Sequence, residues 1–224
     1  MKSSYTTLIL ILFAVSSLFA QEDANEFEKE IVAFEKQDAK NGYQKDFILF
    51  TGSSSIRLWK TMEQDMEGLD ILNRGFGGAK LSDLNLFWER IIGEHDPALV
   101  VLYCGENDIN DGVSVEETFS RFKEFQKKYK KSSKKIPLIY LAMKPSPSRW
   151  SKWENFQATD QKIEKLVNKK KNQTYIDLSS TMLTDKGKPK PEIFISDSLH
   201  MNELGYQGWT EKLRPLIEST LENE

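Results

Sequence analysis

Hydrophobic residues along the chain gather in five short, continuous runs, at residues 47–50, 69–72, 98–103, 136–143 and 174–178. A strand with one face in water alternates apolar and polar side chains, whereas a strand covered on both faces is apolar throughout. The five runs therefore predict parallel strands in the interior of a sheet.

The segments between these runs have the spacing of amphipathic helices. Apolar residues recur every three or four positions at residues 81–92, 115–131, 153–170 and 203–221. A leading helix is expected at about residues 22–40, where Phe27, Ile31 and Phe34 share one face. Strands and helices alternate without a Pro/Gly/Ser linker or an internal repeat. The pattern predicts one α/β domain, a three-layer α/β/α sandwich with about five parallel strands.

The first twenty residues have a different character. Lys2 is the only charged residue before Glu22, an apolar run covers residues 8–15, and small residues lead to Ala20. This order is typical of a secretory signal peptide, and the run is short beside the roughly 20 residues of a membrane span. We expect residues 1–20 to be removed, so that residues 21–224 form an exported domain, periplasmic or secreted. An uncleaved membrane anchor is the alternative.

Composition excludes several classes of protein. The 224 residues contain 31 Lys and Arg, 34 Asp and Glu, and one cysteine, with a net charge of -3. A near-neutral chain is not expected to bind nucleic acid. One cysteine, Cys104, excludes an intrachain disulfide and a Cys-based zinc site, and its place at the end of an apolar run predicts a buried, inert thiol. The Lys-rich residues 127–135 are interpreted as a solvated helix end rather than a docking patch for an anionic polymer.

Only two histidines, His95 and His200, are available to any mechanism that needs an imidazole. His95 stands between acidic residues and before Pro97, and we expect it to be a solvated loop residue. His200 lies three residues after Asp197, so that one turn can present both side chains in the same direction. A carboxylate that orients an imidazole is the arrangement that activates a serine.

Polar groups suited to acyl transfer follow the predicted strands. Ligands of open parallel sheets bind beyond the carboxyl ends of the strands. Residues 52–56 bring serines to this edge, residues 73–78 bring glycines, and Asn107 brings an amide. Glycine backbone N–H groups and an amide can stabilise the oxyanion that forms when a carbonyl carbon becomes tetrahedral. We therefore expect a nucleophilic serine at this edge.

Four blocks of the chain resemble the GDSL, or SGNH, hydrolases. They are Gly52-Ser-Ser-Ser-Ile, Gly78 within residues 73–78, Gly105-Glu-Asn-Asp and Asp197-x-x-His200, in this order over about residues 46–220. The resemblance implies a flavodoxin-like sheet and a serine esterase that needs no metal or organic cofactor.

Matching positions carry the family's roles onto this chain. Ser54, two residues after Gly52, would be the nucleophile, with His200 as its base and Asp197 as the orienting acid. The backbone N–H of Ser54, together with Gly78 and the side chain of Asn107, would form the oxyanion hole. This chain departs from the family at Ser53, which stands where the family usually has Asp. The change alters local hydrogen bonding, and the neighbouring serines 53 and 55 are alternative nucleophiles.

Residues that follow the fourth strand are candidates for lining the substrate site. Lys144 and Arg149 can bind a carboxylate or phosphate, and Trp150 can stack on a sugar ring. A purely structural loop is the alternative. The function expected is an exported esterase acting through a Ser-His-Asp acyl-enzyme on short-acyl, such as acetyl, esters of a carbohydrate or a small molecule. A lysophospholipase or thioesterase, and a non-catalytic carbohydrate-binding module, are the alternatives. No stable membrane insertion is expected after signal cleavage, and the sequence makes no prediction of the oligomeric state.

Overall fold

The five predicted strands form one parallel sheet. A computed structural model describes residues 25–222, so the predicted signal peptide lies outside the described residues. The strand order is β2-β1-β3-β4-β5, the flavodoxin-like order that the resemblance implied. The strands are β1 (Ile48–Gly52), β2 (Ile71–Gly75), β3 (Leu99–Tyr103), β4 (Leu138–Leu141) and β5 (Gln173–Ile176).

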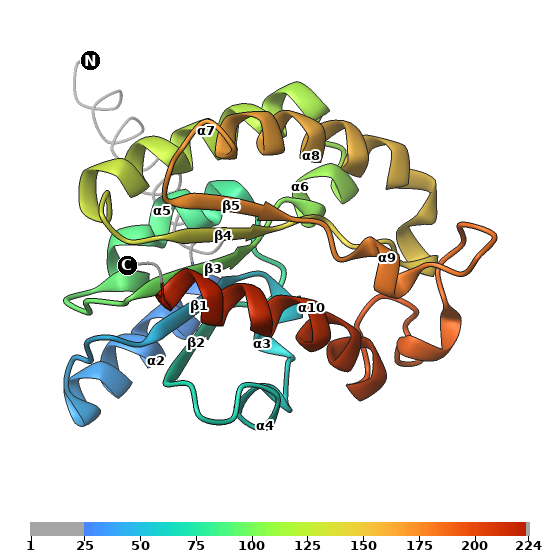
Figure 1. Ribbon diagram of the computed structural model, residues 1–224. Coiled ribbons are helices and arrows are strands. Elements are labelled where there is room, and N and C mark those ends of the chain that lie inside the picture. Colours follow the sequence, from blue (N-terminus) through green and yellow to red (C-terminus); the bar gives the residue numbers. More distant parts are fainter. Residues whose placement is uncertain (1–24, 223–224) are drawn as a thin grey trace, which may run out of the picture.

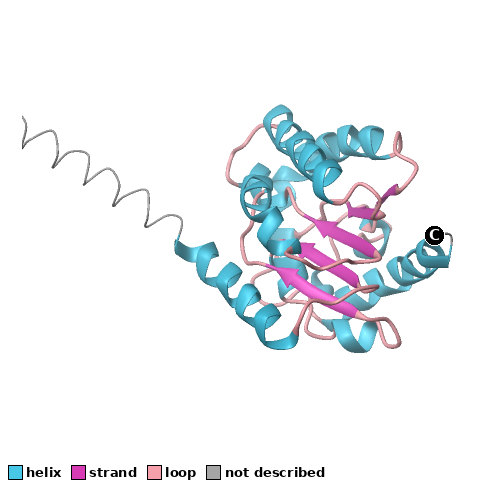
Figure 2. Cartoon of the chain, turned by 90° about the vertical axis from the view of Figure 1, so that its left-hand side faces the viewer, coloured by secondary structure: helices cyan, strands magenta, loops and turns pink. Residues whose placement is uncertain are grey.

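Helices cover both faces of the sheet, as the α/β/α prediction requires (Figures 1 and 2). One face packs against the long predicted helices α2 (Asn25–Asn41), α5 (Leu81–Ile92), α7 (Val115–Ser132) and α8 (Trp153–Val167). The other face packs against α3 (Ser54–Arg57), α4 (Met62–Asp65), α9 (Ser179–Met182) and the long α10 (Glu203–Glu222). The sandwich is therefore complete around a single sheet.

Short helical turns at the strand ends were not predicted. Besides α3, α4 and α9 they are α6 (Glu106–Asn110) and the 3₁₀ turns η1 (Pro147–Lys152) and η2 (Pro191–Ile193). These elements have three to six residues, about one or two helical turns, so they carry too little periodicity to be recognised.

Alternate residues of each strand belong to two different hydrophobic cores. Leu49 packs with the helices on the α5 side, whereas its neighbours Ile48 and Phe50 pack with those on the α10 side. Successive side chains of a strand point to opposite faces, so a strand between two helix layers needs apolar residues at every position. This burial is the physical reason for the continuous apolar runs in the sequence.

His95 differs from its prediction as a solvated loop residue. Its side chain is buried, its Nδ1 accepts a hydrogen bond from the Gln44 backbone N–H at 3.0 Å, and its Nε2 lies 3.0 Å from Asp38 Oδ1. The rings of Tyr43 and Phe47 contact it edge-on. Tertiary packing of α2 against the residues before β3 covers this loop, so His95 has a structural role away from the sheet's carboxyl edge.

Cys104 is buried at the end of β3, as predicted. Burial raises the pKa of its thiol, with a smaller contribution from the nearby carboxylate of Asp108. Within residues 25–222, no helix is long and apolar enough to span a membrane.

Candidate active site

Ser54 is presented by a sharp turn between β1 and α3. Gly52 ends the strand with φ +123°, and a Cβ at that position would lie 1.9 Å from the carbonyl oxygen of Tyr103. Only glycine fits this turn, because any other side chain would collide with the neighbouring strand. The chain then enters α3 at Ser54, whose side chain is partly exposed, while Ser53 and Ser55 on either side are buried. Of the three serines, only Ser54 reaches the surface of the sheet edge.

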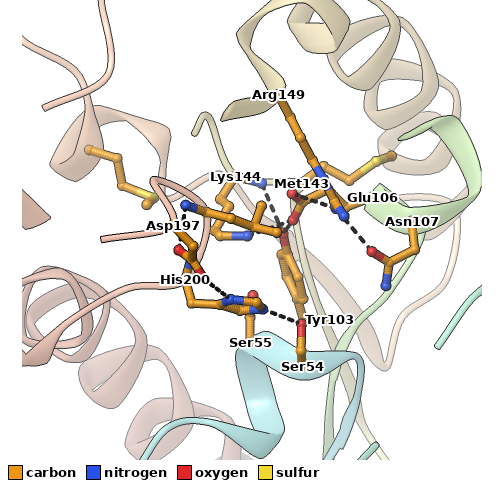
Figure 3. A network of polar contacts seen from close by, with 12 residues as sticks. Ser54, Ser55, Tyr103, Glu106, Asn107, Met143, Lys144, Arg149, Asp197 and His200 are labelled. Atoms are coloured by element: carbon orange, nitrogen blue, oxygen red, sulfur yellow. Dashed lines mark hydrogen bonds and ion pairs between the residues drawn. The ribbon is translucent and has the colours of Figure 1, made fainter. Parts of the chain in front are cut away.

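His200 connects Ser54 to Asp197 through two hydrogen bonds (Figure 3). His200 Nε2 lies 2.9 Å from Ser54 Oγ, and His200 Nδ1 lies 2.6 Å from Asp197 Oδ2. Asp197 Oδ1 accepts the backbone N–H groups of Leu199 and His200, each at 2.9 Å. A carboxylate on Nδ1 keeps the proton on that nitrogen, so that Nε2 can accept the serine proton.

Asp197 is ionised in this arrangement. Partial desolvation raises its pKa. Hydrogen bonds from the His200 side chain and from the Leu199 and His200 backbone outweigh this effect and lower the pKa to about 2. The negative charge that orients the imidazole is therefore present at neutral pH.

The turn that bears His200 is held by backbone hydrogen bonds. The N–H of Ile195 donates to the His200 carbonyl at 2.8 Å, and the N–H of Ser198 donates to the Ile195 carbonyl at 2.9 Å. Ser198 takes φ +58° at the apex. Asn202 then caps the start of α10 by accepting the Gly205 N–H at 3.3 Å. The imidazole is thus anchored to a long helix rather than to a free loop.

Asn107 lies on the other side of the Ser54 hydroxyl from His200 (Figure 3). Asn107 Nδ2 donates one hydrogen to the Ala79 carbonyl at 2.9 Å, which joins it to the turn containing Gly78. Its Oδ1 accepts a hydrogen bond from Arg149 Nη1 at 2.9 Å. Nδ2 carries two hydrogens, and no described residue besides Ala79 accepts from it, so its second hydrogen is available. No described residue accepts a hydrogen bond from the backbone N–H of Ser54 or Gly78.

A buried charged cluster contacts Asn107 through Arg149. The Glu106 carboxylate accepts hydrogen bonds from Lys144 Nζ at 2.7 Å, from Arg149 Nη1 at 2.9 Å and from the hydroxyl of Tyr103. The side chains of Glu106 and Lys144 are each 2% exposed. Burial alone raises the pKa of Glu106, but the charges of Lys144 and Arg149 reverse that effect and hold its pKa below the ordinary value. Burial lowers the pKa of Lys144, and the facing carboxylate opposes this effect.

This cluster favours the structural alternative for Lys144, whose ammonium is buried against Glu106. Nη1 of Arg149 contacts Glu106 and Asn107, and contact of the Arg149 guanidinium with a substrate stays a prediction. Trp150 stacks on Trp153 at 5.9 Å between ring centroids and also carries Lys188 Nζ 4.9 Å from its ring centroid. Its contact with a sugar stays a prediction.

Glu106 and Tyr103 were missed by sequence reasoning, although one signal was available. Glu106 follows the buried strand β3 and Lys144 follows the buried strand β4, and these strands are neighbours in the sheet. Opposite charges at the carboxyl ends of adjacent parallel strands are expected to meet. Among residues 25–222, no group of three His, Cys, Asp or Glu side chains could hold a metal ion.

The sheet and the arrangement at its carboxyl edge are those of an α/β/α ester hydrolase. The chain belongs to the GDSL-like lipase/acylhydrolase family, whose sequence model matches residues 42–207. Among curated proteins, no sequence matches this chain.

Solved structures share the fold at low sequence identity. A Streptococcus pneumonia protein is similar with a TM-score of 0.77 and 18% identity, over 91% of this chain and 98% of its own. A GDSL-like lipase from Bacteroides thetaiotaomicron has a TM-score of 0.69 and 17% identity, over 84% and 97%. A carbohydrate esterase family 3 protein from Talaromyces cellulolyticus has a TM-score of 0.62 and 14% identity, over 80% and 99%. These similarities establish the fold.

Proposed function

We propose that this protein hydrolyses short-acyl carboxylic esters through an acyl-enzyme on Ser54. The observation that carries the proposal is the continuous chain of hydrogen bonds from Ser54 Oγ through the His200 imidazole to the Asp197 carboxylate. These hydrogen bonds end at Ser54, the one serine of the turn that is partly exposed.

Acylation begins when Ser54 Oγ attacks the carbonyl carbon and its proton passes to His200 Nε2. The carbonyl π electrons move to oxygen, and the oxyanion accepts hydrogen bonds from the backbone N–H of Ser54 and Gly78 and from Asn107 Nδ2. When the tetrahedral intermediate collapses, the bond to the alcohol oxygen breaks, and His200 returns the proton to that oxygen. The imidazolium formed in between is stabilised by Asp197.

Deacylation repeats these steps with water in place of serine. His200 Nε2 takes a proton from the water as the water oxygen attacks the acyl carbon, and it then protonates Ser54 Oγ as the acid leaves. Each group involved belongs to this chain, so the reaction needs no further reactant beyond ester and water.

The acyl group proposed is acetyl or another short chain, on a carbohydrate or a small alcohol. A carbohydrate esterase among the proteins that share this fold supports the first of these substrates. The signal-like residues 1–20 support an exported enzyme that meets its substrate outside the cytoplasm. Mass spectrometry of the mature protein from the natural host tests this export, because cleavage would place Gln21 at the new N-terminus.

The test of the activity uses p-nitrophenyl acetate and butyrate. Ser54→Ala and His200→Ala should each lower kcat by about 10³- to 10⁶-fold. Ser55→Ala is the matched control, because Ser55 is adjacent but buried, and it should keep most of the activity. Fluorophosphonate labelling and peptide mapping should place the modification on Ser54.

Two results would contradict the proposal. Equal turnover by wild type and Ser54→Ala would remove the nucleophile, and labelling of Ser53 or Ser55 would move it. A wild-type protein that hydrolyses none of the esters but binds glycans would instead support a non-catalytic binding module on the same fold. An optimum at long acyl chains would favour a lysophospholipase or thioesterase.

A further inference from the structure

An apolar pocket lies beside His200, and apart from His200 its residues take no part in the steps above. Its volume is about 510 Å³, and it lies between the residues that follow α3 and the residues on either side of His200. Neither Gly78 nor Asn107 lines it. The side chains that matter for its chemistry are Leu58, Lys60, Ile195, Met201, Leu204 and Tyr206.

Two of the pocket's apolar side chains are exposed to water. Four large hydrophobic side chains are exposed within residues 25–222, and Ile195 (47%) and Leu204 (58%) are two of them. Exposed apolar side chains that gather in a concave site mark a place where an apolar group binds. Lys60 and Glu203 also line this pocket.

The reaction determines which part of the ester lies toward this pocket. His200 Nε2 must lie within hydrogen-bond distance of the alcohol oxygen that it protonates, whereas the oxyanion must lie among Asn107 and the N–H groups of Ser54 and Gly78. The alcohol part of the ester therefore leaves the reacting carbon on the His200 side. His200 is itself a wall of the pocket.

The geometry points to a leaving-group site: the pocket binds the alcohol part of the ester, and this part carries an apolar alkyl or aryl group. The inference rests on the proposed ester hydrolysis and selects, among its substrates, esters of apolar alcohols over esters of an unsubstituted sugar. The acyl group lies outside this pocket.

The test separates the two halves of the ester. One series holds the acyl group at acetate and varies the alcohol from methyl to butyl and hexyl. The other holds the alcohol at methyl and varies the acyl group from acetate to butyrate and hexanoate. Leu204→Gln and Ile195→Gln remove the apolar wall, and Leu86→Gln is the matched control, since Leu86 is an exposed leucine on α5 outside the pocket.

Wild type should prefer hexyl over methyl acetate in kcat/KM, and Leu204→Gln should lower this preference about tenfold. The acyl series should be unchanged by Leu204→Gln, and Leu86→Gln should change neither series. A change confined to the acyl series, or a wild type indifferent to the alcohol, would overturn the inference.

Binding of 1-hexanol to the Ser54→Ala protein gives a readout that does not need turnover. NMR titration should show saturable binding that weakens in the Ser54→Ala/Leu204→Gln protein. Absence of turnover with intact 1-hexanol binding would refute ester hydrolysis and keep the pocket. Turnover without any 1-hexanol binding would refute the pocket and keep ester hydrolysis.

A second, independent observation concerns Arg149. Its Nη1 lies 2.9 Å from Asn107 Oδ1 and 2.9 Å from Glu106 Oε1. If the Asn107 amide were turned over, its oxygen would face the Ala79 carbonyl and its NH₂ group would face the guanidinium, and both contacts are repulsive. We infer that Arg149 is a positioning residue, which holds the Asn107 amide with Nδ2 toward the oxyanion.

A double-mutant cycle tests this role. Arg149→Gln should lower kcat about ten- to hundredfold with little change in KM, because a misplaced donor acts mainly on the transition state. In the Asn107→Ala background the same substitution should have almost no further effect on kcat. Arg121→Gln, which breaks an ion pair to the neighbouring Asp108, is the control and should behave additively.

Two outcomes would contradict this role of Arg149. An Arg149→Gln effect of the same size in both backgrounds would mean that Arg149 does not act through Asn107. An effect on KM alone would return Arg149 to the role of a substrate-binding cation. Either outcome overturns the inference.

Discussion

The buried ion pair between Lys144 and Glu106 makes the sharpest prediction about stability. Both side chains are 2% exposed and lie 2.7 Å apart. Lys144→Met removes one charge and leaves the Glu106 carboxylate in the interior. Breaking a buried pair in this way costs about 3–5 kcal/mol. Because Arg149 and the Tyr103 hydroxyl still contact Glu106, we expect the lower end of that range, about 3 kcal/mol.

Urea unfolding at pH 7, followed by tryptophan fluorescence, measures this free energy. In a domain of this size the same loss corresponds to a Tm about 6–12 °C lower. Lys80→Met is the matched control, because Lys80 pairs with Asp111 at 2.8 Å with side chains 35% and 45% exposed. Exposed pairs contribute about 0–1 kcal/mol, so this control should unfold almost as wild type does.

A second substitution identifies the buried charge as the cause. In the Lys144→Met background, Glu106→Gln removes the unpaired charge and should recover at least about half of the lost stability. Lys144 lowers the pKa of Glu106 against the effect of burial, so its loss raises that pKa. The stability deficit of Lys144→Met should therefore narrow in acid, where protonation neutralises Glu106. The reasoning is refuted if Lys144→Met unfolds within 1 kcal/mol of wild type, or if the double variant is no more stable than the single one.

Three further predictions follow from single positions. The pKa of Asp197 is lowered from 3.8 to about 2, so its contribution to stability is complete above 3.8 and is lost as the pH falls toward 2. The Tm difference between wild type and Asp197→Asn should therefore shrink as the pH falls from 4 toward 2, and a difference that stays constant over this range would contradict this. Gly52→Ala should yield no folded protein, because the new Cβ would collide with the Tyr103 carbonyl. Gly78→Ala, with φ +77° but open space around it, should fold with a free energy of unfolding lower by about 1–2 kcal/mol. Circular dichroism measures both, and equal losses of stability would contradict the prediction. Cys104 should resist Ellman's reagent until urea unfolds the protein, and rapid labelling of the native state would show that it is accessible.

Much of the fold could be predicted because each element has a local signal. The α5 helix begins and ends at the predicted residues, 81 and 92, and each of the five apolar runs contains or overlaps a strand. The His200 turn could also be anticipated, because Asp197 is only three residues away and a single turn decides their contact. The short helices and the burial of His95 could not, because neither follows from periodicity within one segment.

The sequence by itself determined which residues carry acyl-transfer chemistry and that they follow parallel strands. Tertiary structure decided what each of them faces. Ser54 and His200 are separated by 146 positions, and Glu106 and Arg149 by 43, so their contacts depend on the order and register of the strands. The cations after β4 illustrate the difference, because their charge suggested a substrate but the sheet places β4 beside β3 and turns them toward Glu106. A charge is readable in the sequence, whereas its partner is decided by packing.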